Sequence, residues 1–291
     1  MSLDEEFVAR RQPVVRSRLA GELRALGLGR QPDAVVMVHC RMSALGWVVG
    51  GAETVVAALL DAVGPRGTLL AYTSWQDAPP YELARWPSTW RDAYLAEHPP
   101  FDPARAEAHH SNGRIAEKLR TWPGAVRSRH PDVSFAAVGP QARWLVADHP
   151  FDDPHGPGSP LGRLVEAGGQ VLLLAAPLGT MTLLHHAEAI ARVPDTRRVT
   201  YQMPILVDGE RVWRTFHDID TEGDALPYER VVGPDEDPFA VIVEQMLAAG
   251  IGTAGPAGDG TAHLFDARAA VDFGVAWIQD AFGRGHDEAD A

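Results

Sequence analysis

The sequence predicts an α/β protein in which helices flank a mixed sheet and an antiparallel hairpin is added. Residues 34–38 and 67–72 are short apolar runs typical of buried strands, and residues 52–63 between them have the pattern of a helix. This β-α-β order is typical of a sheet with parallel neighbours. Later in the chain, apolar residues alternate on both sides of an Asp208-Gly209 turn signal, which predicts the hairpin.

Length, composition and charge limit the class of protein. With 291 residues, 45% of them hydrophobic, the chain can bury a sizeable core, and no shift in composition marks a boundary, so a single domain over residues 1–291 is predicted. The formal net charge of −13 disfavours nucleic acid as a partner and favours a cationic small substrate. No apolar run approaches the roughly 18 residues of a membrane span. The N-terminus is acidic where a signal peptide would be basic, so a cytoplasmic protein with no membrane partner is predicted.

The first elements follow helix and strand periodicities. Residues 14–26 carry leucines at helical spacing and end at Gly27, which predicts an amphipathic helix. A loop over residues 39–51 follows the first strand and ends in a Gly-Gly pair. The next helix has Glu53 in its first turn, where the helix dipole favours a carboxylate.

Residues 74–112 interrupt this order as a long aromatic-rich excursion. The segment contains six large aromatic residues and six prolines, and a connection of this length is usually functional or a subdomain. Most of its aromatic side chains are expected to pack the excursion against the main body. Its carboxylates Asp77 and Glu82 could still face a ligand.

The middle of the chain carries a basic turn between a helix predicted at 113–119 and an apolar run at 135–138. Arg127 and Arg129 flank Ser128 in an otherwise acidic protein. Guanidinium groups suit phosphates, so one interpretation is an anion site. The other is a pair of solvated surface arginines.

The second half completes the predicted fold. Ser159 before Pro160 is typical of an N-cap followed by a first-turn proline. Helices are predicted at 141–147, 161–167, 238–249 and 267–282, strands at 171–176 and 263–265, hairpin strands at 199–207 and 211–216, a Gly-rich loop at 250–260 and a polar tail after 283.

Residues 180–188 concentrate reactive side chains on one short predicted helix. Thr182, His185 and Glu188 lie three residues apart and share a face, whereas His186 points about 100° away. This face offers a base with two polar neighbours. A capped helix start with a hydrogen-bonded core histidine is the alternative interpretation.

The histidine and the carboxylates described here could deprotonate a nucleophile that carries an ammonium group. His185 would act as the base, and a second acidic cluster at Asp218 and Asp220 would supply anionic ligand contacts. Either Glu188 or Asp218 could orient the histidine. No Walker motif, G-x-S-x-G elbow, G-x-G-x-x-G or H-E-x-x-H sequence is present, which disfavours an NTPase, a hydrolase, a dinucleotide enzyme and a zincin.

Three alternative chemistries remain open. The only cysteine, Cys40, could form a covalent acyl-enzyme, although a small buried cysteine after a strand is the simpler interpretation. His185, His186 and Glu188 could bind a metal, but His186 points elsewhere on a helix, so no metal is expected. Finally, the protein could bind a cationic small molecule without catalysis.

In chain order, a set of unrelated short motifs resembles the aminoglycoside 3-N-acetyltransferase family. The motifs are VHCRMSALG at 38–46, GG at 50–51, GTL at 67–69, RSRHP at 127–131, GSP at 158–160, APL at 176–178, TLLHHAE at 182–188, LFD at 264–266 and DFGV at 272–275. The resemblance runs from about residue 13 to 282, and it is specific because these motifs fall at the expected separations.

The resemblance implies an enzyme that moves acetyl from acetyl-coenzyme A to an amine of the deoxystreptamine ring of an aminoglycoside, which causes antibiotic resistance. It implies the antibiotic acetyltransferase fold specific to that family. Transfer would be direct, within a ternary complex, with backbone N–H groups stabilising the oxyanion. Two alternatives remain open: a different amino-sugar as the acceptor, or a protein that sequesters an aminoglycoside without catalysis. A homodimer is compatible with the sequence.

The resemblance also implies roles for individual residues. His185 would be the general base, Glu188 its acidic partner, and Thr182 would help to position the thioester or the histidine. The coenzyme A side would include Met42, Ser43, Ala44, Arg127, Ser128 and Arg129. The aminoglycoside side would include Asp77, Asp218 and Asp220. His186 and Cys40 depart from the residues common at their places in the family, and both could shift substrate choice.

Overall fold

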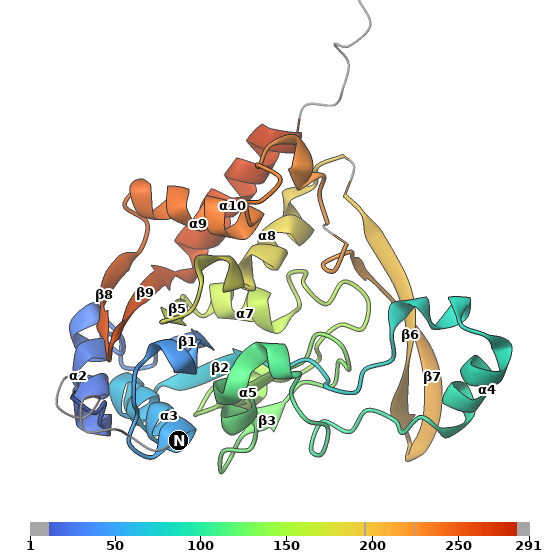
Figure 1. Ribbon diagram of the computed structural model, residues 1–291, viewed down its shortest axis with the longest axis horizontal. Coiled ribbons are helices and arrows are strands. Elements are labelled where there is room, and N and C mark those ends of the chain that lie inside the picture. Colours follow the sequence, from blue (N-terminus) through green and yellow to red (C-terminus); the bar gives the residue numbers. More distant parts are fainter. Residues whose placement is uncertain (1–11, 195, 224, 284–291) are drawn as a thin grey trace, which may run out of the picture.

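A seven-stranded mixed sheet forms the centre of the computed structural model, which describes residues 12–194, 196–223 and 225–283 (Figure 1). The strand order is β3-β4-β2-β1-β5-β9-β8. The strands are β1 (Val35–Cys40), β2 (Thr68–Tyr72), β3 (Val126–Arg127), β4 (Phe135–Val138), β5 (Gln170–Leu174), β8 (Thr253–Ala257) and β9 (Gly260–Asp266). β1 pairs parallel with both β2 and β5, and the outer pairs are antiparallel, so the predicted mixed sheet is confirmed. The predicted tail after residue 283 lies outside the described residues.

Helices cover both faces of the sheet because strand side chains alternate between two cores. Val36 and Val38 of β1 belong to one core, and Val35 and Met37 to the other. The first core is covered by α2 (Arg16–Leu26), α3 (Gly51–Val63) and α5 (Gly113–Arg120). The second is covered by α6 (Ala142–Val146), α7 (Pro160–Glu166), α8 (Leu183–Ala191), α9 (Pro238–Ala248) and α10 (Ala267–Phe282). Within the described residues, no helix is both long and apolar enough to cross a membrane.

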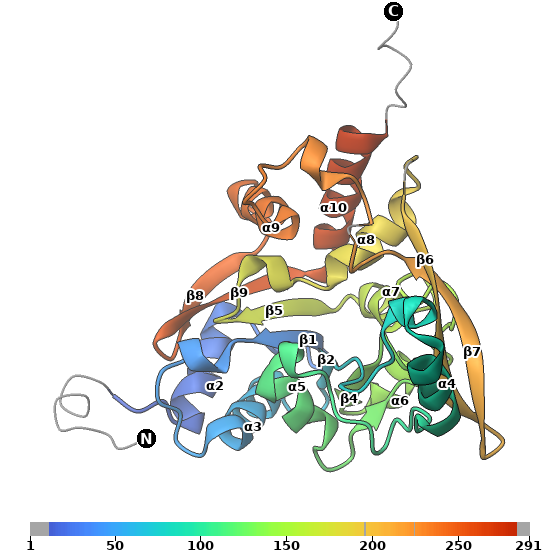
Figure 2. The same ribbon diagram turned by 45° about the vertical axis from the view of Figure 1, so that its right-hand side comes forward.

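The predicted hairpin is confirmed as a separate two-stranded sheet, β6 (Arg198–Val207) and β7 (Glu210–Ile219). Asp208 and Gly209 between the strands have φ angles of 50° and 85°, as a tight hairpin turn requires. Figure 2 shows the hairpin beside the main body, with α4 (Ser88–Glu97) against it.

The aromatic-rich excursion packs mainly on this hairpin. It contains η2 (Tyr81–Arg85), α4 and η3 (His110–Asn112), none of which the sequence predicted. Phe101 donates its backbone N–H to Pro204, and the indole of Trp213 donates to the carbonyl of Leu95. The sequence predicted packing against the main body, whereas Tyr81 stacks on Tyr201 of the hairpin at 4.4 Å. Trp90 on α4 is 70% exposed.

Two strands and one helix start differ from the sequence prediction. The predicted Gly-rich loop contains β8, because this segment pairs with β9 once the chain turns back. The predicted basic turn begins as β3, which pairs with β4. The predicted helix over residues 180–188 is divided between η4 (Leu178–Thr180) and α8, which begins at Leu183.

Candidate active site

A cavity of about 600 Å³ opens at the carboxyl ends of the parallel strands β1, β2 and β5. This is the edge at which open α/β sheets usually bind ligands. The lining residues are His39, Cys40, Arg41, Met42, Ser43, Tyr72, Ser111, Asn112, Gly113, Arg114, Ala176, Pro177, Gly179, Thr180, Thr182, His185 and Phe239. Segments that are far apart in sequence therefore meet in one cavity.

The short helix α8 presents an imidazole–carboxylate pair to this cavity. His185 Nδ1–H donates a hydrogen bond to Glu188 Oε2 at 2.7 Å, so the side chains predicted to share a face do so. Glu188 is buried, with 2% of its side chain exposed, whereas 24% of the His185 side chain is exposed. Thr182 precedes the first turn, and its hydroxyl makes no capping bond, so it is available to the cavity that it lines.

A third residue fixes the carboxylate. The Tyr228 hydroxyl donates to Glu188 Oε1 at 2.7 Å, so both carboxylate oxygens are engaged. An ionised carboxylate can only accept hydrogen bonds, and the Nδ1 of His185 must therefore carry the proton. The lone pair of the neutral imidazole is then on Nε2, which is the atom left to accept a proton.

The sequence left open whether Glu188 or Asp218 holds His185, and the structure favours Glu188. The Asp218 carboxylate instead accepts a hydrogen bond from His155 Nδ1 at 3.1 Å, and both side chains are buried. Burial opposes protonation of His155, but the charge and hydrogen bond of Asp218 outweigh it and raise the pKa of His155. The ring of His155 lies 5.3 Å from that of His185, so two imidazole–carboxylate pairs are neighbours.

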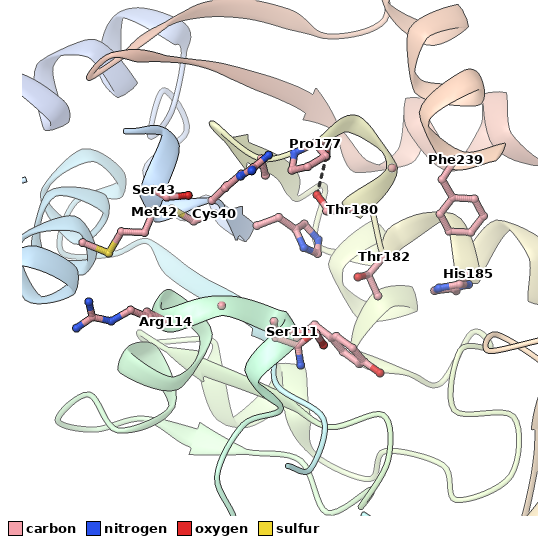
Figure 3. A pocket seen from close by; sticks show the side chains of 17 residues that line it. Cys40, Met42, Ser43, Ser111, Arg114, Pro177, Thr180, Thr182, His185 and Phe239 are labelled. Atoms are coloured by element: carbon pink, nitrogen blue, oxygen red, sulfur yellow. Dashed lines mark hydrogen bonds between the residues drawn. The ribbon is translucent and has the colours of Figure 1, made fainter. Parts of the chain in front are cut away.

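The other end of the cavity is cationic. Figure 3 shows Met42, Ser43 and Arg114 on the side of the cavity opposite to His185 and Phe239. Met42 and Ser43 belong to η1 (Met42–Ala44), and Arg41 precedes it. Ala44, predicted with them, does not line the cavity. Neither arginine was predicted as a ligand contact, although Arg41 lies within the VHCRMSALG motif, and no motif marks Arg114.

The basic turn predicted to contact coenzyme A does not line this cavity. Arg127 donates to Ser134 Oγ at 3.0 Å and to the carbonyls of Ser74 and Ala106, so its guanidinium ties the excursion to the sheet. Burial lowers the pKa of Arg127 to about 9. This residue lines a different cavity, as does Arg129.

Ser128 is likewise a structural residue. It is fully buried, accepts the backbone N–H of Phe135 at 3.0 Å and lies 3.1 Å from His149 Nδ1. His149 Nε2–H donates to the carbonyl of Pro154 at 2.8 Å. With a neutral imidazole, all of these groups are satisfied, which leaves Ser128 no free polar atom for a ligand.

None of the three predicted aminoglycoside contacts lines the cavity. Asp77 is exposed, and its carbonyl accepts the Nε2–H of His98 at 3.0 Å. Asp220 accepts the backbone N–H of Gly223 at 2.8 Å. Asp218 is 1% exposed and bound to its histidine, which corrects the prediction that it faces a ligand directly.

Three acidic side chains nevertheless lie near enough to Tyr72, which lines the cavity, to act on it by their charge. Asp132, Asp218 and Glu222 all raise the pKa of this tyrosine by their charge, in addition to the larger effect of burial. Burial also raises the pKa of Asp132 to about 6, although the Tyr81 hydroxyl donates to it at 2.6 Å. The sequence prediction missed Asp132, which directly follows the RSRHP motif.

The structure bears on two of the alternative chemistries. Burial raises the pKa of Cys40 to about 12, so its reactive thiolate form is disfavoured. His186 turns away from the cavity and donates Nδ1–H to the carbonyl of His155 at 2.6 Å. Within residues 12–194, 196–223 and 225–283, no three His, Cys, Asp or Glu side chains group closely enough to hold a metal ion.

Comparisons with known proteins identify the family of this chain. The family model described as Aminoglycoside 3-N-acetyltransferase matches residues 37–279. Aminoglycoside N(3)-acetyltransferase VII of Streptomyces paromomycinus is 58% identical over 284 residues, which cover 97% of this chain and 98% of the relative. The crystal structure of aminoglycoside acetyltransferase AAC(3)-Xa is 59% identical, with a TM-score of 0.91 over 93% of this chain and 94% of that one.

A further solved structure is described as AAC-IIIb binary with CoASH. It is 43% identical to this chain, with a TM-score of 0.85 over 94% of this chain and 99% of that chain. The family match spans most of the chain, and the relatives match nearly end to end. The chain therefore belongs to the aminoglycoside 3-N-acetyltransferase family.

Proposed function

We propose that this protein transfers acetyl from acetyl-coenzyme A to the 3-amino group of the deoxystreptamine ring of an aminoglycoside, and so confers resistance to it. The observation that carries the proposal is the His185–Glu188 pair at one end of a cavity whose other end is lined by Arg41 and Arg114. Family membership supports the reaction, and the relative bound to CoASH supports the donor.

His185 acts as the general base. With Nδ1–H held by Glu188, Nε2 takes a proton from the acceptor nitrogen as this nitrogen attacks the thioester carbonyl carbon. The tetrahedral oxyanion then collapses, the C–S bond breaks, and the imidazolium returns the proton to the leaving sulfur. The products are the N-acetylated aminoglycoside and coenzyme A with a free thiol.

Thr182 and the first loop position the thioester. The Thr182 hydroxyl has no capping role and lies on the same side of α8 as His185, where it donates to the thioester carbonyl. Met42 and Ser43 line the cavity at the end that Arg114 lines, opposite to the base. Arg41 and Arg114 pair with the phosphates of coenzyme A, since guanidinium groups match phosphate oxygens.

The acceptor end attracts a polycation. The charges of Asp132, Asp218 and Glu222 raise the pKa of Tyr72. Those of Asp218 and Glu222 also raise the pKa of Asp132. Carboxylates in a partly buried site raise the local concentration of a cationic substrate and orient its ammonium groups. Asp218 contributes to the attraction of the cationic substrate by its negative charge and by its hydrogen bond to His155, with no direct ligand contact.

Thiol release that depends on added aminoglycoside tests the proposal. The protein is mixed with acetyl-coenzyme A, and free thiol is measured with and without each member of an aminoglycoside panel; mass spectrometry of the product locates the acetyl group. Release with at least one aminoglycoside, and acetylation at the 3-amino group, are expected. Tight aminoglycoside binding without thiol release would instead identify a sequestering protein, and acetylation of another amino-sugar would correct the acceptor.

A homodimer is the proposed oligomeric state. Trp90 on α4 and the side chains of Val207 and Val212 on the hairpin are exposed apolar groups. Covering them against a second copy would remove apolar surface from water. Light scattering of the purified protein should give twice the mass of one chain, and the mass of a single chain would contradict this state.

A further inference from the structure

Phe239 lies against the active-site histidine and comes from a different helix, α9. Its ring centroid is 4.8 Å from that of His185, with an angle of 56° between the ring planes. Phe239 is 8% exposed and lines the same cavity. Figure 3 shows the two rings next to each other at the end of the cavity opposite to Arg114.

The hydrogen bond to Glu188 does not by itself fix the tilt of the His185 imidazole ring. It fixes the position of Nδ1, but the ring can still tilt about the line from Nδ1 to Glu188, and such a tilt moves Nε2. Packing against the ring restricts that tilt. Phe239 packs on His185 at 4.8 Å, and His155 lies 5.3 Å away, also at 56°.

We propose that Phe239 is a positioning residue, which holds the His185 ring so that Nε2 faces the acceptor nitrogen. This role rests on the proposed function of His185 as the general base. The Phe239 ring is a hydrocarbon and exchanges no proton or bond in the reaction. Its contribution is geometric, because proton transfer in the attack step requires the base within hydrogen-bond reach of the amine.

The start of α9 holds Phe239 in place. The Asp237 carboxylate caps α9 by accepting the backbone N–H of Phe239 at 2.9 Å, and Pro238 fixes the first turn. A Cβ atom at Gly179 would collide with that carboxylate, so the turn before α8 packs closely against the cap. The Phe239 ring also packs edge-on against Tyr228, at 6.3 Å and 86°. One side chain therefore contacts both the histidine and the tyrosine that fixes Glu188.

The expected effect follows from the precision that catalysis needs. A displacement of about 1 Å in a reacting group can cost up to roughly a hundredfold in rate. We expect Phe239→Ala to lower kcat by about tenfold and Phe239→Leu to lower it less, since leucine refills part of the volume. The KM for acetyl-coenzyme A should stay unchanged, because the arginines that bind it lie at the other end of the cavity.

A double-mutant cycle distinguishes positioning of His185 from a general structural role. Phe239→Ala and Phe239→Leu are each made in the natural protein and in the His185→Ala variant, and aminoglycoside-dependent thiol release is measured. In the His185→Ala background neither Phe239 variant should lower the residual rate further. An equal fold-decrease in both backgrounds overturns the proposal, and so does unchanged kcat in both Phe239 variants.

Phe282→Leu is the matched control. Phe282 is also 8% exposed, and its ring packs on Tyr228 at 5.6 Å, but among the ring contacts of the described residues it has none with His185. We expect its kcat to match that of the natural protein, and a loss as large as that of Phe239→Leu overturns the proposal. If Phe239→Ala does not fold, Phe239→Leu decides by the same comparisons. Near-normal turnover of His185→Ala would instead overturn the base assignment itself.

Discussion

The Glu188 carboxylate accepts the Nδ1–H of His185 at 2.7 Å and, on its other oxygen, the hydroxyl proton of Tyr228, also at 2.7 Å. The carboxylate thus sets the tautomer and the direction of the imidazole and is itself held by a residue 40 positions later in the chain. This chain of three residues gives an ordered set of expected kinetic effects.

Removing the members of this chain should reduce kcat in a fixed order. His185→Ala loses the general base, which is typically worth about two to four orders of magnitude. Glu188→Gln keeps the shape but offers the histidine a neutral partner, and a loss of roughly 10- to 100-fold is expected. Tyr228→Phe removes one hydrogen bond, worth about 1 kcal/mol, so a loss of about fivefold is expected.

The measurement is kcat for each variant at saturating acetyl-coenzyme A, with donor binding followed by calorimetry. Binding should survive in all three variants, since none lies at the cationic end. A Glu188→Gln enzyme with near-normal kcat would show that Glu188 is not the main support of the base. A Tyr228→Phe enzyme as impaired as His185→Ala would contradict the expected order.

Arg41→Ala and Arg114→Ala should each raise the KM for acetyl-coenzyme A. A charge-assisted hydrogen bond is worth roughly 1.5–3 kcal/mol, so an increase of at least about tenfold is expected. The increase should be accompanied by a weaker dependence of donor binding on salt. Steady-state kinetics at two salt concentrations checks both effects.

Arg129→Ala is the matched control for these two arginines. It removes an exposed guanidinium of the same charge that lines a different cavity. Its donor KM should equal that of the natural protein. A large increase in this variant, with none for Arg114→Ala, would return the phosphate site to the basic turn.

Cys40→Ala should retain full turnover. The thiol lines the cavity, but burial raises its pKa to about 12, so at neutral pH only a minute fraction is the nucleophilic thiolate. Initial-rate kinetics should show intersecting patterns typical of a ternary complex. Parallel lines, or a burst of thiol without acceptor, would point to an acetyl-cysteine intermediate.

The protein should lose stability as the pH falls below about 6.5. Burial lowers the pKa of His149 to about 3, so between pH 6.5 and 3 the unfolded chain binds a proton at this histidine that the folded chain does not. The free energy of unfolding therefore decreases as the pH falls. At pH 5 the loss from this one residue is about 2 kcal/mol relative to pH 7.

Denaturant unfolding at several pH values tests this contribution. In His149→Gln, the free energy of unfolding should depend less steeply on pH, by the equivalent of up to one bound proton. Other buried histidines should preserve part of the pH dependence. Identical slopes in the variant and the natural protein would contradict it. Between pH 7 and 8 both proteins should show little change, because this histidine is neutral in both states.

Much of the fold could be predicted because its signals are local. The two parallel β-α-β strands, the hairpin at Asp208-Gly209 and most helices appear where periodicity and turn residues place them. β8 could not be predicted in this way, because its Gly- and Pro-containing sequence forms a strand only by pairing with β9. The same holds for β3, whose two residues pair with β4.

The sequence by itself determined the face of α8. Helical spacing alone places His185 and Glu188 within hydrogen-bond reach, because residues three apart lie on one side of a helix. The ordered motifs also determined the family. Both kinds of information depend on the order of residues along the chain, and no knowledge of distant contacts is needed.

Only the tertiary structure decided which distant groups serve that face. Arg127 has the same charge as Arg114, but its guanidinium N–H groups donate to backbone carbonyls. Arg114 instead lines the cavity. Tyr228 and Phe239 reach the pair on α8 from positions 40 and more residues later. Such partners depend on how helices and loops pack in space, which is set by the whole core rather than by neighbours along the chain.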